Sequence, residues 1–143
     1  MCEKIDNLRG TFLSNFHEAT VVYDGIRYRN AESAFQSAKL ADKKERLQFQ
    51  KLTGAEAKAL GKKIKLRDDW EEIKLKVMYD VVSAKFANNE DLRNQLIWTW
   101  EKEIVEGNTW GDTYWGVCRG KGENHLGKIL MWIRKDIINE RYI

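Results

Sequence analysis

The chain has no proline, only two cysteines and two histidines, and no long apolar run, and these shortages exclude several classes of protein. Cys2 and Cys118 lie far apart in the sequence, and neither forms a metal-ligand motif with His17 or His125. We therefore expect neither a disulfide scaffold nor a metal site, and a cytoplasmic, reducing compartment. The first ten residues lack the apolar core of a signal peptide, and no segment approaches the length of a membrane span.

The composition that remains is that of a globular domain. Hydrophobic residues make up 43% and charged residues 33% of the 143 positions, so we expect one domain over residues 1–143. The net charge of +3 is too small to indicate nucleic-acid binding, although it permits a local basic pocket for a phosphate. Four of the six tryptophans fall between Trp98 and Trp115. Such indoles usually fill a core, but beside polar residues they can also stack on a base.

The residue pattern predicts a mainly α (α+β) fold: a compact helical single domain with a small N-terminal β hairpin. Residues 21–23 and 26–28 flank the turn dipeptide Asp24-Gly25, which is typical of a hairpin. We expect a short strand at 104–105 and helices over residues 31–41, 43–51, 54–61, 68–86, 90–100 and 125–138. Asn30 should cap the first helix, a Thr53–Glu56 capping box should open the third, and the third should end near Gly61, a residue type typical of the C′ position.

Three polar residues of the first predicted helix are candidates for chemistry. Glu32, Gln36 and Lys39 are spaced four and three residues apart, so they share one helix face. Such a face is ordinarily solvated. It can also present an acid, an amide and an ammonium group to a pocket, with Phe35 as a neighbouring wall.

The segment 107–124 has five glycines and predicts a long loop, which is usually functional or mobile. Glu106 and Asp112 flank its first part, close to Tyr114 and Trp115. Cleavage of a glycosidic bond needs a carboxylate near the anomeric carbon and an acid for the leaving group, and aromatic surroundings suit the acid. Two acids in a Gly-rich turn can equally serve the turn itself.

The end of the same segment suggests an anion site. Arg119 and Lys121 lie among glycines ahead of a predicted helix N-terminus, where backbone N–H groups favour a phosphate. The segment matches neither a Walker loop nor the dinucleotide fingerprint, and Asn124 can be explained as a simple N-cap.

Taken in order, these segments resemble the NADAR domain, also called the YbiA-like family. The matching pieces extend over nearly the whole chain: residues 13–16, 26–28, 31–39, 57–61, 70–78, 85–86, 92–99, 106, 112–116, 122–127 and 130–134. Each piece is weak alone, and the ordered set is specific.

The resemblance implies a mainly helical fold with a small β portion and metal-free, cofactor-free hydrolysis of an N-glycosidic bond to ribose. It implies one of two substrates: a ribosylamino-pyrimidine phosphate intermediate of riboflavin synthesis, or ADP-ribose linked to guanine, free or within nucleic acid. We assign candidate catalytic roles to Glu32, Lys39, Asp112 and Glu106. Candidate substrate-binding residues are Ser14, Asn15, Phe16, Gln36, Trp115, Gly116, Arg119, Lys121 and Asn124.

Two alternatives to an enzyme are open at this point. A non-catalytic module that binds ADP-ribose or a related nucleotide would need the stacking and phosphate-binding residues but not the carboxylates. A purely structural helical module would leave the polar helix face and the Gly-rich loop without a purpose. The intact Glu32 and Asp112 favour the enzyme, with water as the nucleophile, while the choice of general acid between them stays open.

Overall fold

A computed structural model describes residues 4–142 of the chain and the side chains of residues 4–140. The chain divides into two compact units. We call residues 14–89 the hairpin unit, and residues 1–13 together with 90–143 the terminal unit. Cys2 lies outside the described residues, and Cys118 is a buried free thiol. No helix among the described residues is long and apolar enough to cross a membrane.

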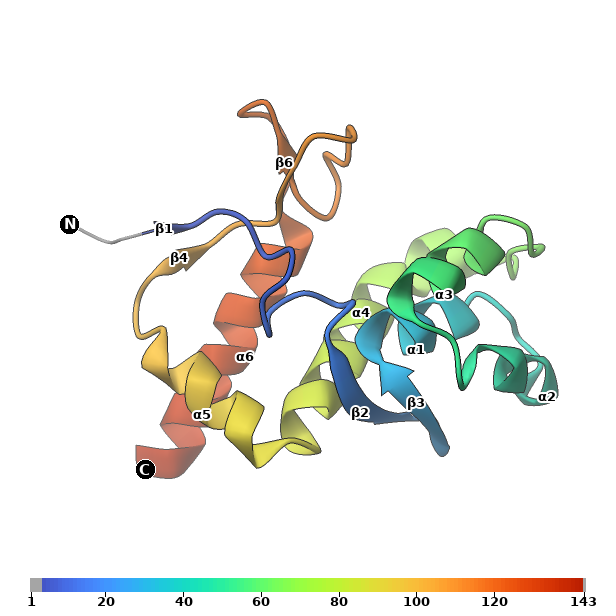
Figure 1. Ribbon diagram of the computed structural model, residues 1–143, viewed down its shortest axis with the longest axis horizontal. Coiled ribbons are helices and arrows are strands. Elements are labelled where there is room, and N and C mark those ends of the chain that lie inside the picture. Colours follow the sequence, from blue (N-terminus) through green and yellow to red (C-terminus); the bar gives the residue numbers. More distant parts are fainter. Residues whose placement is uncertain (1–3, 143) are drawn as a thin grey trace. The chain divides into compact units, whose positions relative to one another are not determined.

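The hairpin unit combines one two-stranded sheet with helices (Figure 1). Its elements are β2 (Glu18–Tyr23), β3 (Ile26–Asn30), α1 (Ala31–Ser37), α2 (Lys43–Arg46), the 3-10 helix η1 (Leu47–Phe49), α3 (Gly54–Gly61) and α4 (Trp70–Ala87). Strands β2 and β3 are antiparallel and joined by Asp24-Gly25, where both residues have positive φ. This is the turn type that matches the twist of a two-residue hairpin, so the predicted hairpin is confirmed.

The side-chain caps predicted at the starts of α1 and α3 are both confirmed. The Asn30 side chain accepts a hydrogen bond from the Ser33 backbone N–H at 2.8 Å and caps α1. The capping box of Thr53 and Glu56 is present at the start of α3. The third helix ends near Gly61 as predicted. Gly61 is the last residue of α3 and Lys62 is its C-cap, so Gly61 does not take the expected C′ position.

Helix α1 is shorter and more buried than its sequence predicts. It ends at Ser37, and a turn continues the chain through residues 38–40. All seven of its residues are buried, so the face with Glu32 and Gln36 is not the solvated surface of an amphipathic helix. Helices α3 and α4 both pack against α1 (Figure 1). Phe35 of α1 contacts Trp70 of α4, with ring centroids 5.2 Å apart.

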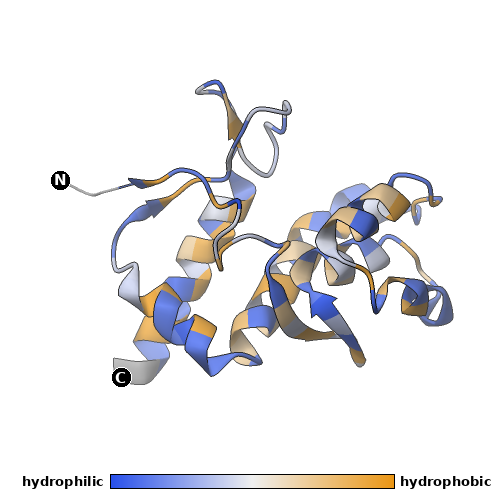
Figure 2. Ribbon diagram, viewed as in Figure 1, coloured by the Kyte–Doolittle hydropathy of each residue, from blue (hydrophilic) through white to orange (hydrophobic). Residues whose placement is uncertain are grey.

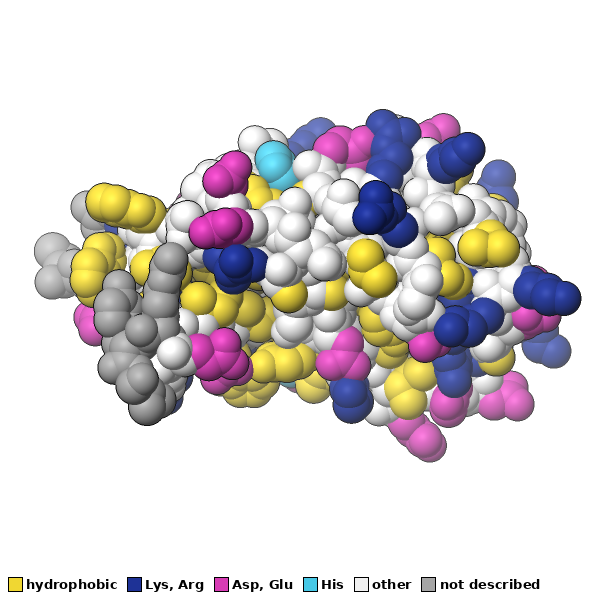
Figure 3. All heavy atoms as spheres, turned by 90° about the horizontal axis from the view of Figure 1, so that it is seen from below, with side chains coloured by type: hydrophobic (Ala, Val, Ile, Leu, Met, Phe, Trp, Pro, Cys, Tyr) yellow, Lys and Arg dark blue, Asp and Glu magenta, His cyan; other side chains and the backbone are white. Residues whose placement is uncertain are grey.

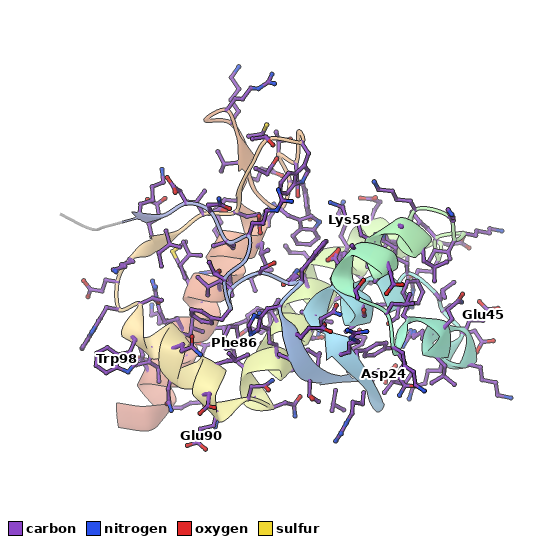
Figure 4. The ribbon with its side chains drawn as sticks, viewed as in Figure 1. Asp24, Glu45, Lys58, Phe86, Glu90 and Trp98 are labelled. Atoms are coloured by element: carbon purple, nitrogen blue, oxygen red, sulfur yellow. The ribbon has the colours of Figure 1, made fainter. Side chains whose placement is uncertain are left out.

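The expected helix over residues 43–51 is broken. Regular α-helix covers only α2, and η1 follows it. The buried Arg46 guanidinium donates hydrogen bonds to the Leu40 backbone carbonyl at 2.8 Å and to the Asp24 carboxylate at 2.8 Å. Asp24 lies at the tip of the hairpin (Figure 4), so Arg46 ties the hairpin turn to this helical segment.

The terminal unit contains two longer helices and short paired strands. Its elements are β1 (Lys4–Ile5), α5 (Glu90–Trp98), β4 (Glu103–Ile104), β5 (Gly107–Asn108), β6 (Val117–Cys118) and α6 (His125–Tyr142). Strand β4 pairs with β1 in parallel, and β5 pairs with β6 in parallel. Apolar residues recur along α6 between hydrophilic ones (Figure 2), and its buried side packs on α5 and β4.

The surface carries charges of both signs. On the face drawn in Figure 3, Lys and Arg side chains are interspersed with Asp and Glu side chains. This mixture agrees with the small net charge of +3. The fold is thus a mainly helical α+β fold, as predicted.

Candidate functional site

Glu32 is a buried carboxylate in the first turn of α1. Its side chain is only 8% exposed, and Oε1 accepts a hydrogen bond from Gln36 Nε2 at 3.0 Å. Its backbone N–H donates to the carbonyl of Asn15 at 2.9 Å, so the chain segment before the hairpin is fixed to the start of this helix. The four-residue spacing of Glu32 and Gln36 does place them together, as the sequence predicted.

Lys39 completes the predicted trio from the turn that follows α1. Burial lowers the pKa of its ammonium group, the nearby Glu32 carboxylate opposes that shift, and Lys62 adds to it. The Lys39 backbone carbonyl accepts a hydrogen bond from the Arg67 N–H at 2.9 Å, which holds the turn. The acid, the amide and the ammonium group therefore lie in one neighbourhood of the hairpin unit.

Residues 14–17 form a tight turn beside this neighbourhood. The Ser14 hydroxyl accepts a hydrogen bond from the Phe16 N–H, and the Ser14 carbonyl accepts one from Lys85 Nζ at 2.9 Å. Lys85 is fully buried in α4, and burial lowers its pKa to about 7. The pattern of apolar spacing in α4 gave no sign that a lysine would point into the interior.

Phe16 is the outward-facing residue of this turn. Its side chain is 43% exposed, and its ring lies against Gly54, where an added Cβ would come within 2.6 Å of Cγ. The first residue of α3 must therefore be small. Phe16, the predicted stacking residue, thus has one part of its ring against Gly54 and another part exposed to solvent.

Two buried side-chain oxygens in the hairpin unit have no hydrogen-bond partner among the described residues: Asn15 Oδ1 and Gln36 Oε1. The Asn15 side-chain nitrogen faces the Met78 sulfur at 3.3 Å, which is a weak acceptor. Because buried polar atoms are nearly always paired, each unpartnered acceptor needs its own explanation.

In the terminal unit, Asp112 closes a turn. Its Oδ1 accepts hydrogen bonds from the Tyr114 and Trp115 N–H groups at 3.2 and 3.0 Å. Asn108 holds the other side of the turn, because its side chain bonds both the N–H and the carbonyl of Asp112. The Asp112 carboxylate therefore has a structural task in addition to any chemical one.

Both backbone groups of Glu106 are hydrogen-bonded within the terminal unit. Its N–H donates to Asn124 Oδ1 at 2.9 Å, and its carbonyl accepts from the Val117 N–H at 2.8 Å. The Asn124 side chain also donates to the Ile104 carbonyl at 2.9 Å. Gly116 is required here, since an added Cβ would lie 2.0 Å from the Glu106 carbonyl oxygen. The two predicted binding residues Asn124 and Gly116 thus shape the position of Glu106.

The Gly-rich segment is far more regular than the predicted long loop. Cys118 and Lys121 exchange both backbone hydrogen bonds across Arg119-Gly120, which have positive φ, so this part is a tight two-residue turn. Arg119 and Lys121 are exposed on that turn. Both side chains therefore project from a hydrogen-bonded two-residue turn and not from an irregular loop.

Four backbone N–H groups at the start of α6 are already hydrogen-bonded within the chain. The N–H groups of residues 123–126 donate to the carbonyls of residues 113, 116, 114 and 115. Since chain carbonyls occupy these four donors, they are not available to a phosphate.

An aromatic cluster around His125 was not anticipated from the sequence. The rings of Tyr114 and His125 lie 4.5 Å apart, those of Tyr114 and Trp115 lie 4.7 Å apart, and His125 approaches Glu123 at 3.3 Å. The other four tryptophans of this unit are exposed, contrary to the expectation that they fill the core. Trp98 is 77% exposed on α5 (Figure 4). The other exposed ones are Trp100, Trp110 and Trp132.

Within the described residues, no group of three or more His, Cys, Asp or Glu side chains is arranged to hold a metal ion. The features that stand out are a buried carboxylate, an amide hydrogen-bonded to it and a half-buried ammonium group that it influences electrostatically, on a mainly helical α+β fold. They define a candidate carboxylate-based active site.

This chain belongs to the NADAR domain family, whose model matches residues 4–138. It is 33% identical over 132 residues to the N-glycosidase YbiA of Escherichia coli, covering 90% of this chain and 82% of that protein. It is 34% identical over 133 residues to an N-glycosidase of Nostoc punctiforme, covering 88% and 85%. A riboflavin biosynthesis protein of Vibrio vulnificus is 33% identical over 132 residues, which are 88% of this chain and 35% of that one.

The solved structures include a similar chain. The NMR structure of the E. coli protein YbiA matches with a TM-score of 0.84 and 32% identity, over 99% of this chain and 89% of that chain. The family and the fold class predicted from the sequence are therefore both confirmed.

Proposed function

We propose that this protein is an N-glycosidase that hydrolyses the bond between a phosphorylated ribose and a nitrogenous base. The names of the E. coli and N. punctiforme relatives support this activity, because the similarity extends over most of both chains. The observation that carries the proposal within this chain is the buried Glu32 carboxylate, which accepts a hydrogen bond from Gln36 and acts electrostatically on the half-buried Lys39. Burying a carboxylate costs free energy, which hydrogen bonds and nearby cations offset only in part. A carboxylate that a protein keeps buried is therefore a candidate catalytic group.

The reaction passes through a state with positive charge on the sugar ring. An ionised carboxylate beside the anomeric carbon stabilises that charge, and its effect is larger where water is excluded. Glu32 is shielded from water and held by a neutral donor, which suits this electrostatic role. Water is the nucleophile that completes the hydrolysis.

Lys39 is the proposed partner of the substrate phosphate. It is a half-buried cation in the electrostatic range of Glu32. A cation that binds phosphate in both ground and transition states acts mainly on KM, and one this near the carboxylate also affects kcat. Arg119 and Lys121 are exposed cations of the terminal unit and are proposed to contribute to KM alone.

Asn15 is proposed to bind the base. Its buried Oδ1 has no partner among the described residues, so it can accept a hydrogen bond from a ring N–H or an amino group. Its backbone is hydrogen-bonded to Glu32, which keeps the acceptor near the carboxylate. The neighbouring exposed ring of Phe16 is proposed to stack on the same base.

Two substrate classes fit this proposal. One is the ribosylamino-pyrimidine phosphate type, which is favoured by the name of the V. vulnificus relative. The other is ADP-ribose linked to guanine, free or within nucleic acid. Both bases carry N–H donors and both sugars carry phosphate, so substrate assays are needed to separate them.

The decisive experiment incubates the purified protein with each substrate class and identifies the products by mass. We expect release of the free base and of the phosphorylated sugar from one class, and loss of about a hundredfold or more in kcat in Glu32→Gln. Asp112→Asn keeps an oxygen for the turn, so a comparable loss in that folded variant would assign Asp112 a chemical role, whereas a loss confined to Asp112→Ala would assign it to the turn.

The alternative to this proposal is a non-catalytic module that binds ADP-ribose or a related nucleotide. If both substrate classes remain intact while ADP-ribose or a related nucleotide binds with a measurable Kd, the protein is a non-catalytic nucleotide binder. Full activity in Glu32→Gln would remove this carboxylate from the mechanism.

A further inference from the structure

Gly61, the last residue of α3, lies against a side chain of α1. A Cβ added to Gly61 would be 1.9 Å from Gln36 Oε1 and 2.7 Å from Gln36 Cδ. Gly61 is not among the glycines with positive φ, so its backbone conformation is open to any residue. Alanine would also be the better helix former by about 1 kcal/mol. The glycine is therefore explained by the space that Gln36 occupies.

Gln36 is held between that glycine and the Glu32 carboxylate. Its side chain is 5% exposed, Nε2 donates to Glu32 Oε1 at 3.0 Å, and Oε1 is a buried atom without a hydrogen-bond partner in the described residues. The reversed amide would turn its oxygen toward the carboxylate, and two acceptors facing each other repel. The observed orientation thus requires room for an oxygen directly over residue 61.

We propose that Gly61 is a positioning residue for Glu32, acting through Gln36. The absence of a side chain at position 61 admits the Gln36 amide to the place from which it donates to the carboxylate. That bond restricts the rotation of the Glu32 side chain. The inference rests on the proposed function only in taking Glu32 to be the catalytic carboxylate.

The effect of a substitution at Gly61 is predicted to be selective. The atom that must move is the far end of a flexible side chain and not backbone, so α3 and the fold should form normally in Gly61→Ala. The displaced amide then loses its bond to Glu32. A misplaced catalytic group can cost about a hundredfold in rate, so we expect kcat to fall roughly 10- to 100-fold with little change in KM.

A double-mutant cycle tests whether Gly61 acts through Gln36. The variants are Gly61→Ala, Gln36→Ala and the double variant, with thermal unfolding to verify the fold. If the only function of the glycine is to admit the amide, the double variant should have the kcat of Gln36→Ala alone. The matched control is Ala59→Gly, the reverse exchange at an exposed position of the same helix, which should leave kcat unchanged.

A second measurement does not depend on any substrate. In 15N NMR spectra, the side-chain amide protons of Gln36 should exchange slowly with solvent in the wild type and at least tenfold faster in Gly61→Ala. The Ala59→Gly spectrum should retain the slow exchange. This readout reports on the bond to Glu32 even if the protein hydrolyses neither substrate class.

The outcomes separate the two claims. Wild-type exchange at Gln36 in Gly61→Ala, or a double variant whose kcat is much lower than that of Gln36→Ala, overturns the role of Gly61. An inactive wild-type protein overturns the proposed function instead, and a fully active Glu32→Gln removes Glu32 from the mechanism while leaving the activity itself established. Fast Gln36 exchange in Gly61→Ala together with a non-additive loss of kcat supports both.

Discussion

At the scale of single residues, the side-chain oxygen of Asn15 makes no hydrogen bond within the described residues that would stabilise the fold. Its buried oxygen has no partner among the described residues, and its nitrogen faces only the weak acceptor of Met78. A buried acceptor left without a donor lowers stability, and its replacement by an apolar group of similar shape is often neutral or favourable. The residue is thus better explained by a ligand than by the fold.

We therefore predict that Asn15→Leu preserves stability and impairs substrate binding. The melting temperature should be equal to or above that of the wild type, whereas KM for the cleaved substrate should rise about tenfold or more. Thermal unfolding and steady-state kinetics on the same preparation measure both. A lower melting temperature with an unchanged KM would assign Asn15 to the fold.

Lys85 makes a prediction about pH. Burial lowers its pKa from 10.5 to about 7 in the folded protein. Between these values the unfolded chain binds a proton that the folded protein has released, so the free energy of unfolding increases as pH rises from 7 toward 10.5. One such group changes the free energy of unfolding by at most about 1.4 kcal/mol per pH unit. Well below pH 7 this slope vanishes, because Lys85 is protonated in both the folded and the unfolded state.

The variant Lys85→Met should lose this pH dependence. Denaturant titrations between pH 7 and 9.5 should give a shallower slope of unfolding free energy against pH in Lys85→Met than in the wild type. Lys39 has a pKa shifted in the same direction, and it is present in both proteins, so the difference isolates Lys85. The upper limit avoids Tyr23 and Tyr28, whose pKa values burial raises above their ordinary value. Equal slopes in the two proteins would show that Lys85 remains charged in the fold.

At the scale of elements, the start of α6 depends on Asn124. Its side chain joins the Glu106 N–H to the Ile104 carbonyl, and its own φ is +54°. Asparagine tolerates this left-handed conformation better than most residues. One side chain therefore fixes the segment that carries Glu106.

We predict that Asn124→Ala destabilises the protein by roughly 1–3 kcal/mol for each backbone group left unpaired. Asn124→Gly relieves the backbone strain but also lacks the hydrogen bonds, so it should recover only part of the loss. Asn124→Asp keeps an acceptor for the Glu106 N–H but turns an oxygen toward the Ile104 carbonyl, so it should also be less stable than the wild type. Denaturant unfolding of the three variants gives the order. A fully stable Asn124→Gly would show that only the backbone conformation matters.

The elements that could be predicted from the sequence are those fixed by neighbours in the chain. The Asp24-Gly25 turn and the Asn30 cap depend on hydrogen bonds and φ values within a few residues. The length of α1 and the burial of its polar face depend instead on packing against α3 and α4, which no local pattern contains.

The candidate site divides in the same way. The spacing of Glu32 and Gln36 was sufficient to bring them together. The function of Gly61 could not be predicted, because it follows from a contact across 25 positions and its residue type suggested only a helix end. Likewise, the turn bonds of Asp112 and the occupied amides before α6 could be known only from the folded chain.

At the scale of the whole molecule, the prediction concerns metal dependence. The mechanism proposed above uses carboxylates, cations and water, so hydrolysis should persist in excess chelator. The measurement is kcat before and after dialysis against EDTA, with divalent ions added back. Loss of activity that a divalent ion restores would refute this mechanism.

Helix α1 finally bears on how this protein can change over evolutionary time. All seven of its residues are buried, so the helix offers no outward position at which substitutions can accumulate neutrally. Two of those residues are polar groups that bind each other, and a change in one removes the partner of the other. New substrate preferences are therefore expected to arise from exposed positions such as Phe16, Arg119 and Lys121, while residues 31–37 resist exchange in a saturation mutagenesis screen.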